Sequence, residues 1–349
     1  MRFDLSEDQK LLRDATRDFL SAESPIEVSR RVSEAEGEGF SAAQWDKLAE
    51  LGYLGLLSSE TVGGQGLGPI ELAVVCEEMG RVCYPGPYLD VVLAAELLAR
   101  AGEQGALTEV VRGASIVVLA TDDRVWSNES ARTEFNSGRV NGKKFFVPFA
   151  SAARYLVATT DRGLAFVEGP FDVEAMPTLD ESRRYGAVSL DNPARLIADN
   201  ELLESVWQLG AIGSAAMALG VAEETLESSV QYSRERETFG RPIGSYQALQ
   251  HRMADMLVRS EASRALVYKA AWACSTAQGD AALIAASAKS YASRAANLNS
   301  RECLQIHGGN GFTWEYNVHR YLKLAMTLEH YYGSREVMTD RALAELGCT

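Results

Sequence analysis

The sequence predicts an α+β protein in which a β-rich segment separates two helical segments. Apolar residues recur at helical spacing near both ends of the chain, whereas short β-branched runs fill the stretch between them. The 349 residues, 46% of them hydrophobic, suffice for two or three structural units with a large buried core. The expected domains are an N-terminal helical domain at 1–113, a middle β domain at 114–201 and a C-terminal helical domain at 202–349.

In the N-terminal segment, two apolar stripes have helical spacing, one from Leu11 to Phe19 and one from Leu48 to Leu57. Glycine- and proline-rich stretches at 62–69 and 85–87 are typical of the loops between helices.

The middle segment alternates β-branched runs with turn residues. Runs at 115–119 and 155–160 predict strands, and Asn-Gly and Asn-Ser-Gly sequences between them predict turns. The chain after this segment is again helical, and its alanine- and serine-rich part favours close approach between helices. We expect three long helices there, at roughly 205–236, 245–276 and 280–306.

Charge and cysteine content argue against several classes of protein. The 48 acidic residues against 34 basic ones give a net charge of −14, which disfavours binding to nucleic acid or to anionic lipid. Five scattered cysteines form no Cys-x-x-Cys pair, so neither a zinc site nor a disulfide framework is expected. No signal-peptide core and no apolar run of about 18 residues is apparent, and we therefore expect a soluble, cytoplasmic protein.

Short motifs in a fixed order along the chain point to one family. They are the Phe3–Gln9 opening, Trp45–Gly52, Gly63–Gly66, Pro85–Leu89, Arg234–Gly240 with Gln247, and Gln305–Gly311. In their order and spacing the chain resembles the acyl-CoA dehydrogenases over almost its whole length.

The resemblance implies an N-terminal helical domain, a middle β domain and a C-terminal four-helix bundle, assembled as a dimer or a dimer of dimers. It also implies FAD as cofactor, an acyl-CoA substrate oxidised at Cα–Cβ, and an electron-transfer flavoprotein as electron acceptor. In this family FAD lies at a subunit interface, where one chain holds the flavin and its neighbour grips part of the adenosine and pyrophosphate.

The motifs that match the family's pyrophosphate grip are present. Arg236 would supply the guanidinium fork, and Thr238 and Gln247 would donate hydrogen bonds. Gly308 and Gly309 would allow the backbone to approach the ligand closely. The plainer interpretation is a solvated arginine near a helix end and glycines that only end a helix. The predicted cofactor-binding residues are Arg236, Thr238, Phe239, Gln247, Gln305, Ile306, His307, Gly308 and Gly309.

The motifs that match the family's flavin-ring side are degraded. The family's Gly-Ser-Asp loop is absent, since the corresponding stretch at 120–126 contains no Gly-Ser pair. The Asn-Gly-x-Lys strand survives at 141–149, but Pro148 stands where the family has a threonine. Proline offers neither a hydroxyl nor a backbone N–H.

No catalytic base stands where the family has one. The resemblance places Tyr332 at one family position of the glutamate and Gly210 at the other. A phenol with an ordinary pKa near 10 is a poor base at neutral pH, and glycine is none. Glu329 and Glu204 are nearby in sequence and remain alternatives, although a surface position is the simpler interpretation of both.

The motifs for the pyrophosphate are present, whereas those for the flavin ring and the base are not. This pattern favours a subunit of a heteromeric acyl-CoA dehydrogenase, similar to the base-less chains known from steroid side-chain degradation. A second acyl-CoA dehydrogenase-like chain would supply the glutamate in an α2β2 assembly. The alternatives are an autonomous homomeric dehydrogenase that uses Glu329 or Glu204, and a non-catalytic chain that only stabilises a partner. The steroid substrate rests on the resemblance alone.

Overall fold

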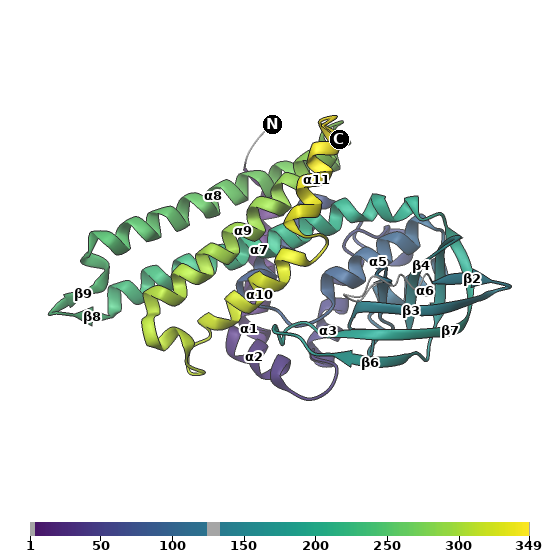
Figure 1. The fold of residues 1–349 in the computed structure, drawn as a ribbon, viewed down its shortest axis with the longest axis horizontal. Helices are drawn as coiled ribbons and strands as arrows, with labels where there is room; N and C mark the ends of the chain where they lie inside the picture. Colours follow the sequence, from purple (N-terminus) through teal and green to yellow (C-terminus); the bar gives the residue numbers. More distant parts are fainter. Residues whose placement is uncertain (1–3, 124–132, 349) are drawn as a thin grey trace. The chain divides into compact units, whose positions relative to one another are not determined.

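The computed structural model describes residues 4–123 and 133–348, and its helices and strands confirm the α+β fold class. The chain divides by its internal contacts into two units (Figure 1). Unit 1 comprises Met1–Arg30, Pro69–Tyr84 and Gln208–Thr349, and unit 2 comprises Arg31–Gly68 and Pro85–Trp207. The N-terminal helices are shared between these units, so the three sequence-based domain boundaries stay a prediction.

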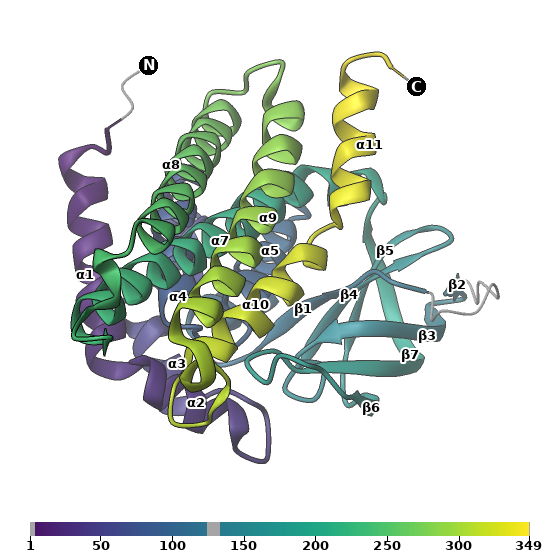
Figure 2. The same cartoon turned by 60° about the vertical axis from the view of Figure 1, so that its left-hand side comes forward.

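Unit 1 is helical, and the three long helices expected near its C-terminal part are present within a few residues of their predicted ends. Helices α7, α8, α9 and α10 run side by side (Figure 2). The helices of this unit are α1 (Glu7–Glu23), α4 (Pro69–Arg81), α7 (Glu201–Glu235, which begins in unit 2), α8 (Gln247–Ser275), α9 (Ala281–His307), α10 (Val318–His330) and α11 (Arg335–Glu345), with the short strands β8 (Glu237–Thr238) and β9 (Arg241–Pro242) between α7 and α8 and the 3-10 turns η3 (Ile243–Ser245) and η4 (Gly308–Phe312).

Helices α4 and α7 cross at two glycines that leave no room for side chains. A Cβ atom on Gly80 would lie 2.1 Å from the Met217 carbonyl oxygen. One on Gly220 would lie 2.0 Å from the Glu77 carbonyl oxygen. Since the obstructing atoms belong to backbone, the crossing requires glycine at both positions.

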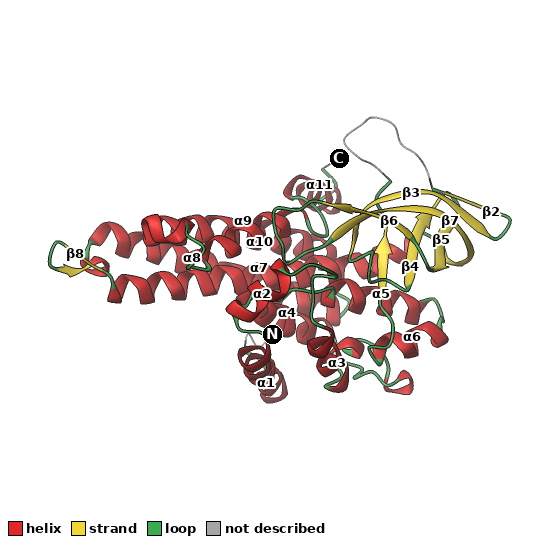
Figure 3. Cartoon of the chain, turned by 90° about the horizontal axis from the view of Figure 1, so that it is seen from below, coloured by secondary structure: helices red, strands yellow, loops and turns green. Residues whose placement is uncertain are grey.

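Unit 2 combines helices with a seven-stranded sheet in the order β1-β4-β5-β7-β3-β2, with β6 paired to β7. The strands are drawn in yellow in Figure 3. Strands β1 and β4 are parallel, and the other pairs are antiparallel. The strands are β1 (Val117–Ala120), β2 (Glu134–Asn136), β3 (Arg139–Pro148), β4 (Tyr155–Thr160), β5 (Gly163–Glu168), β6 (Asp172–Met176) and β7 (Tyr185–Ala198); the helices are α3 (Ala42–Glu50), α5 (Tyr88–Arg100), α6 (Gln104–Val111) and the short turns η1 (Tyr53–Gly55) and η2 (Glu60–Val62), while α2 (Ile26–Glu34) spans the boundary with unit 1.

Helix α7 corrects one expectation from the sequence. By length and composition it is long and apolar enough to cross a membrane, although no such run was apparent in the sequence. Its apolar window is 83% buried inside the structure, as in the core helix of a soluble protein.

Candidate functional site

The hairpin between α7 and α8 carries three of the residues predicted to hold the cofactor. Arg236 directly follows α7, and its amide donates to the Tyr232 carbonyl oxygen at 2.8 Å. Thr238 ends β8, and Phe239 and Gly240 form the turn into β9. Both turn residues have positive φ, of 54° and 77°, which is the geometry of a two-residue type I′ hairpin. The local sequence therefore builds a tight, projecting turn.

Phe239 is unusual in this turn. An aromatic residue with positive φ is strained by about 1 kcal/mol or more, and strain of this kind is concentrated at functional sites. Phe239 is also 92% exposed, so no described part of the chain buries it. Arg236, Thr238 and Gln247 are exposed as well. The hairpin thus presents two cations, Arg236 and Arg241, polar side chains and an aromatic ring to whatever binds there.

The end of α9 contributes the glycines. Gly308 has φ 61° and ψ −135°, a backbone conformation that is open essentially to glycine alone. A Cβ atom on Gly308 or Gly309 would meet nothing within 4 Å, so the space over this backbone is open. Gln305 is exposed beside them. These features fit the close backbone approach that a diphosphate requires.

Ile306 and His307 face the opposite way. Ile306 is buried and packs in an apolar cluster with Met256 and Val318. The His307 ring stacks on Tyr232 with centroids 4.2 Å apart, and its Nδ1 donates to the Cys303 carbonyl oxygen at 2.8 Å. Burial lowers the pKa of His307. Both side chains therefore pack inside the helical unit, behind the exposed residues of the site. Their contact with a cofactor stays a prediction.

A short polar network joins the two halves of this site. The Asn310 amide donates to the Tyr232 hydroxyl at 3.2 Å, and that hydroxyl lies 3.5 Å from the His307 carbonyl oxygen. The end of α7 is thereby tied to the junction of α9 and η4. As a result the hairpin and the glycines lie at the same end of the helical unit (Figure 1). Sequence reasoning missed Tyr232, although it lies one helical turn before Arg236.

Next to this network, unit 1 contains a groove of about 960 Å³ lined mainly by apolar and aromatic side chains. Tyr232 and His307 form part of its wall, and the Tyr316 ring meets both edge-on, at 6.4 Å and 6.1 Å. The groove adjoins the predicted cofactor residues without including the hairpin itself.

The two positions that the resemblance assigns to the family's base meet in the structure. A Cβ atom on Gly210 would lie 2.3 Å from Cδ1 of Tyr332, so the ring rests directly on the α7 backbone. Tyr332 has φ 57°, and the Ser214 hydroxyl donates to the Tyr331 carbonyl oxygen at 3.2 Å. Neither position holds a carboxylate, and an aromatic ring fills the space between them.

The two alternative carboxylates occupy other surroundings. Glu329 is half-buried, and its Oε2 accepts a hydrogen bond from Asn297 at 3.2 Å. Glu204 is exposed in the first turns of α7.

A buried lysine contacts the end of α10, a few residues before Tyr332. Lys289 of α9 is 1% exposed, and its ammonium donates to the Leu328 carbonyl oxygen at 2.6 Å and to Ser293 Oγ at 2.9 Å. Burial lowers the pKa of Lys289 to about 7, and the nearby Glu329 carboxylate opposes this shift. Sequence reasoning could not identify it, because a lysine in an alanine-rich helix is usually solvated.

In unit 2, the residues expected near a flavin ring are in the β sheet. Pro148 is buried at the end of β3, opposite Tyr185 of β7. Lys144 is fully buried, and its ammonium lies 2.6 Å from Asp123 and 2.8 Å from Thr159. Part of the degraded loop, at 124–126, lies outside the described residues.

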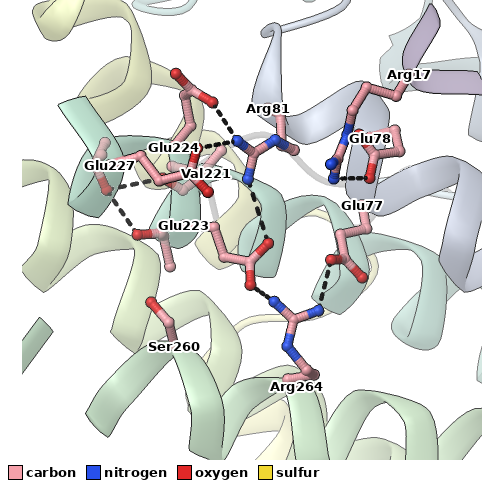
Figure 4. Close-up of polar contacts among 12 residues, drawn as sticks. Arg17, Glu77, Glu78, Arg81, Val221, Glu223, Glu224, Glu227, Ser260 and Arg264 are labelled. Carbon is pink, nitrogen blue, oxygen red and sulfur yellow. Dashed lines mark hydrogen bonds and ion pairs between the residues drawn. The ribbon is translucent and has the colours of Figure 1, made fainter. Parts of the chain in front are cut away.

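Unit 1 is braced by a cluster of arginines and glutamates that the sequence analysis did not identify (Figure 4). Arg81 of α4 pairs with Glu224 at 2.8 Å and also with Glu223 and Glu227 of α7. Arg264 of α8 pairs with Glu223 as well. Burial raises the pKa of Glu224, although Arg81 opposes that shift. Because every carboxylate here has a guanidinium partner, we assign the cluster to packing of the helices.

The same cluster includes two further glutamates of α4 and extends to α1. Glu77 of α4 is buried and accepts from Arg264 at 2.9 Å and from the Tyr268 hydroxyl at 2.6 Å. Glu78 accepts two hydrogen bonds from Arg17 of α1. Within the described part of the chain, no group of three or more His, Cys, Asp or Glu residues is placed to hold a metal ion.

Family models establish the class of protein. The N-terminal domain model of the acyl-CoA dehydrogenases matches residues 6–111, and their C-terminal domain model matches residues 202–347. The chain therefore belongs to the acyl-CoA dehydrogenase family. Its members are FAD-dependent oxidoreductases that act on CH–CH bonds, and FAD is accordingly the cofactor of this class.

Among individual relatives, the acyl-CoA dehydrogenase IpdE2 of Mycobacterium tuberculosis is 32% identical, covering 91% of this chain and 91% of that protein. FadE27 of the same organism is 30% identical over 93% of this chain and 92% of its own length. Among solved structures, the ChsE4–ChsE5 complex from Mycobacterium tuberculosis has a chain with TM-score 0.90 and 28% identity, with both chains fully covered. A Tcur3481–Tcur3483 steroid ACAD variant has a TM-score of 0.89, 27% identity and 98% coverage of each chain.

The contact between Gly210 and Tyr332 predicts a specific coupling of stabilities. Gly210→Ala should destabilise the wild-type chain by roughly 1–3 kcal/mol, because its methyl group overlaps the ring. In a Tyr332→Ala background the same change should be neutral or stabilising by up to about 1 kcal/mol, since alanine favours the helix. Urea denaturation of the four chains measures the difference.

The matched control is Gly220→Ala, whose methyl group meets the Glu77 carbonyl oxygen and not Tyr332. It should destabilise both backgrounds equally. An equal cost of Gly210→Ala in the two backgrounds would contradict the observed packing.

The buried Lys289 predicts a pH dependence of stability. Its pKa is about 7 in the folded chain and 10.5 when unfolded, so the unfolded state binds more protons between these values. The free energy of unfolding should therefore rise with pH over this range, by up to about 1.4 kcal/mol per pH unit, relative to Lys289→Met. Denaturation of both chains from pH 6 to about 10 tests this, and parallel curves would refute the assignment.

Proposed function

We propose that this chain is one subunit of a heteromeric acyl-CoA dehydrogenase. It contributes a half-site for the adenosine and pyrophosphate of FAD, and a second acyl-CoA dehydrogenase-like chain supplies the flavin-ring contacts and the catalytic glutamate. The observation that carries the proposal is the Tyr332 ring on Gly210, where the family has its base.

The length of α7 supports a half-site that serves another chain. Gly210 and Glu235 lie on one continuous helix, and a rise of 1.5 Å per residue separates them by about 37 Å. This exceeds the reach of an extended dinucleotide. An FAD gripped by Arg236 therefore presents its flavin to chemistry outside the acyl position of the same chain.

Each residue of the half-site has a defined part. The Arg236 guanidinium binds the pyrophosphate oxygens as a fork, and Thr238, Gln247 and Gln305 donate hydrogen bonds from the same end of the unit. Gly308 and its neighbour allow the backbone to approach. When bound, FAD supplies the hydride acceptor for oxidation at Cα–Cβ. The partner's glutamate removes the α-proton, because no carboxylate of this chain lies at that position.

Relatives support the finer details. The ChsE4–ChsE5 structure is a complex, and the Tcur3481–Tcur3483 protein is a steroid ACAD. We therefore propose an α2β2 assembly, an acyl-CoA thioester of a steroid side chain as substrate, and a cytoplasmic location. A structure of electron transferring flavoprotein and a caffeyl-CoA reductase–Etf complex subunit are also similar, which favours an electron-transfer flavoprotein as acceptor.

Arg236 is the residue to change. In the assembly with the partner chain, Arg236→Ala should weaken FAD binding by about 2 kcal/mol, or roughly 30-fold in the dissociation constant. Arg236→Lys should recover only part of this, since lysine keeps the charge without the fork. Flavin absorbance per chain after dialysis gives the measurement.

Arg234→Ala is the matched control, because this substitution removes the same charge as Arg236→Ala. Arg234 is an exposed arginine on the last turn of α7. Its replacement should leave FAD content unchanged. Full flavin retention in Arg236→Ala would overturn the half-site. Loss of turnover in Glu329→Gln, with flavin content unchanged, would instead favour an autonomous enzyme that uses Glu329 as base.

A further inference from the structure

The end of α10 is held by a buried cation. The last carbonyl groups of a helix lack partners within it and carry partial negative charge. Here the Lys289 ammonium donates to the Leu328 carbonyl oxygen at 2.6 Å and lies 3.5 Å from that of Glu329. Its third contact is Ser293 Oγ at 2.9 Å. Lys289 therefore caps α10 from the neighbouring helix, with one acceptor for each of its three protons.

Burying a lysine is costly, so its presence indicates a constraint. An ammonium group loses its hydration when buried and is tolerated only where hydrogen bonds replace that water. Lys289 lies in a helix whose other buried positions are mostly small or apolar. A methionine would fill the same volume without this cost. Packing alone therefore does not account for a charged side chain at this position.

The cap lies directly before the turn that carries Tyr332. The Tyr331 amide donates to the Thr327 carbonyl oxygen at 3.1 Å, and the Gly333 amide donates to that of His330 at 3.0 Å. Between them Tyr332 has φ 57°, a left-handed conformation that disfavours an aromatic residue. Such strain persists only when the surroundings impose it. The path of the chain out of α10 decides whether the ring reaches Gly210.

We propose that Lys289 is a positioning residue that keeps the acyl position of this chain closed. By fixing the last turn of α10, it imposes the left-handed turn at Tyr332 and seats that ring on Gly210. The inference rests on the proposed function, in which this chain needs no base. An acyl thioester approaching α7 at Gly210 would meet the ring, so the chain excludes this class of substrate and leaves it to the partner.

The test is a comparison of coupling energies in the full-length chain. The coupling between Gly210→Ala and Tyr332→Ala is measured by urea denaturation, first with Lys289 and then with Lys289→Met. If Lys289 positions the turn, the coupling should fall by half or more in the methionine background. A residue that only adds stability would shift all four free energies of unfolding together and leave the coupling unchanged.

Two further variants sharpen the result. Lys269→Met removes an exposed lysine of α8 and should leave the coupling intact. Ser293→Ala removes one of the three contacts of Lys289, so it should partially lower the coupling between Gly210→Ala and Tyr332→Ala. If the Lys289→Met chain does not fold, Ser293→Ala takes its place in the test. Unchanged coupling in these Lys289 and Ser293 variants would overturn the proposal. Because the experiment uses neither flavin nor partner, its failure leaves the Arg236 test of the half-site unaffected.

Discussion

The helical unit depends on the close crossing of α4 and α7, where Gly80 and Gly220 bring two backbones into contact. A side chain at either position would overlap a carbonyl oxygen, so the crossing fixes where α7 lies along α4. The ion pairs between the half-buried Arg81 and the glutamates of α7 then restrict the rotation of α7. With α7 fixed in position and rotation, Gly210 faces the turn after α10, and the end of α7 that precedes Arg236 is tied to the end of α9 through Tyr232.

In the proposed function, this arrangement separates two tasks that a complete acyl-CoA dehydrogenase combines. The hairpin after α7 presents exposed arginines and an aromatic residue with positive φ, and the end of α9 presents open glycine backbone. The other region is closed by the Tyr332 ring, and its polar groups are engaged within the chain. In the proposed function, a second chain supplies the complementary features. The heteromeric ChsE4–ChsE5 complex provides a precedent for this assembly among similar structures.

Much of this could be predicted from the sequence, because helices α7, α8 and α9 follow from local periodicity and the family motifs are short and contiguous. Contacts between distant positions could not. The contact of the Tyr332 ring with the Gly210 backbone depends on tertiary structure alone. The same is true of the hydrogen bond from Lys289 to the end of α10. The motif around Gln305 also contains neighbours in sequence whose side chains lie on different faces of a helix. Gln305 is exposed, whereas Ile306 and His307 are buried.

The central claim is that this chain lends half of a cofactor site and no base. Its most direct measurement is the flavin content and activity of the purified chain, alone and together with its partner. We expect a nearly colourless, inactive chain alone, and about one FAD per heterodimer in the assembly. Activity should vanish when the partner's glutamate is replaced, and Tyr332→Glu should add little. A homomer of this chain with one FAD per subunit and clear dehydrogenase activity would contradict the account.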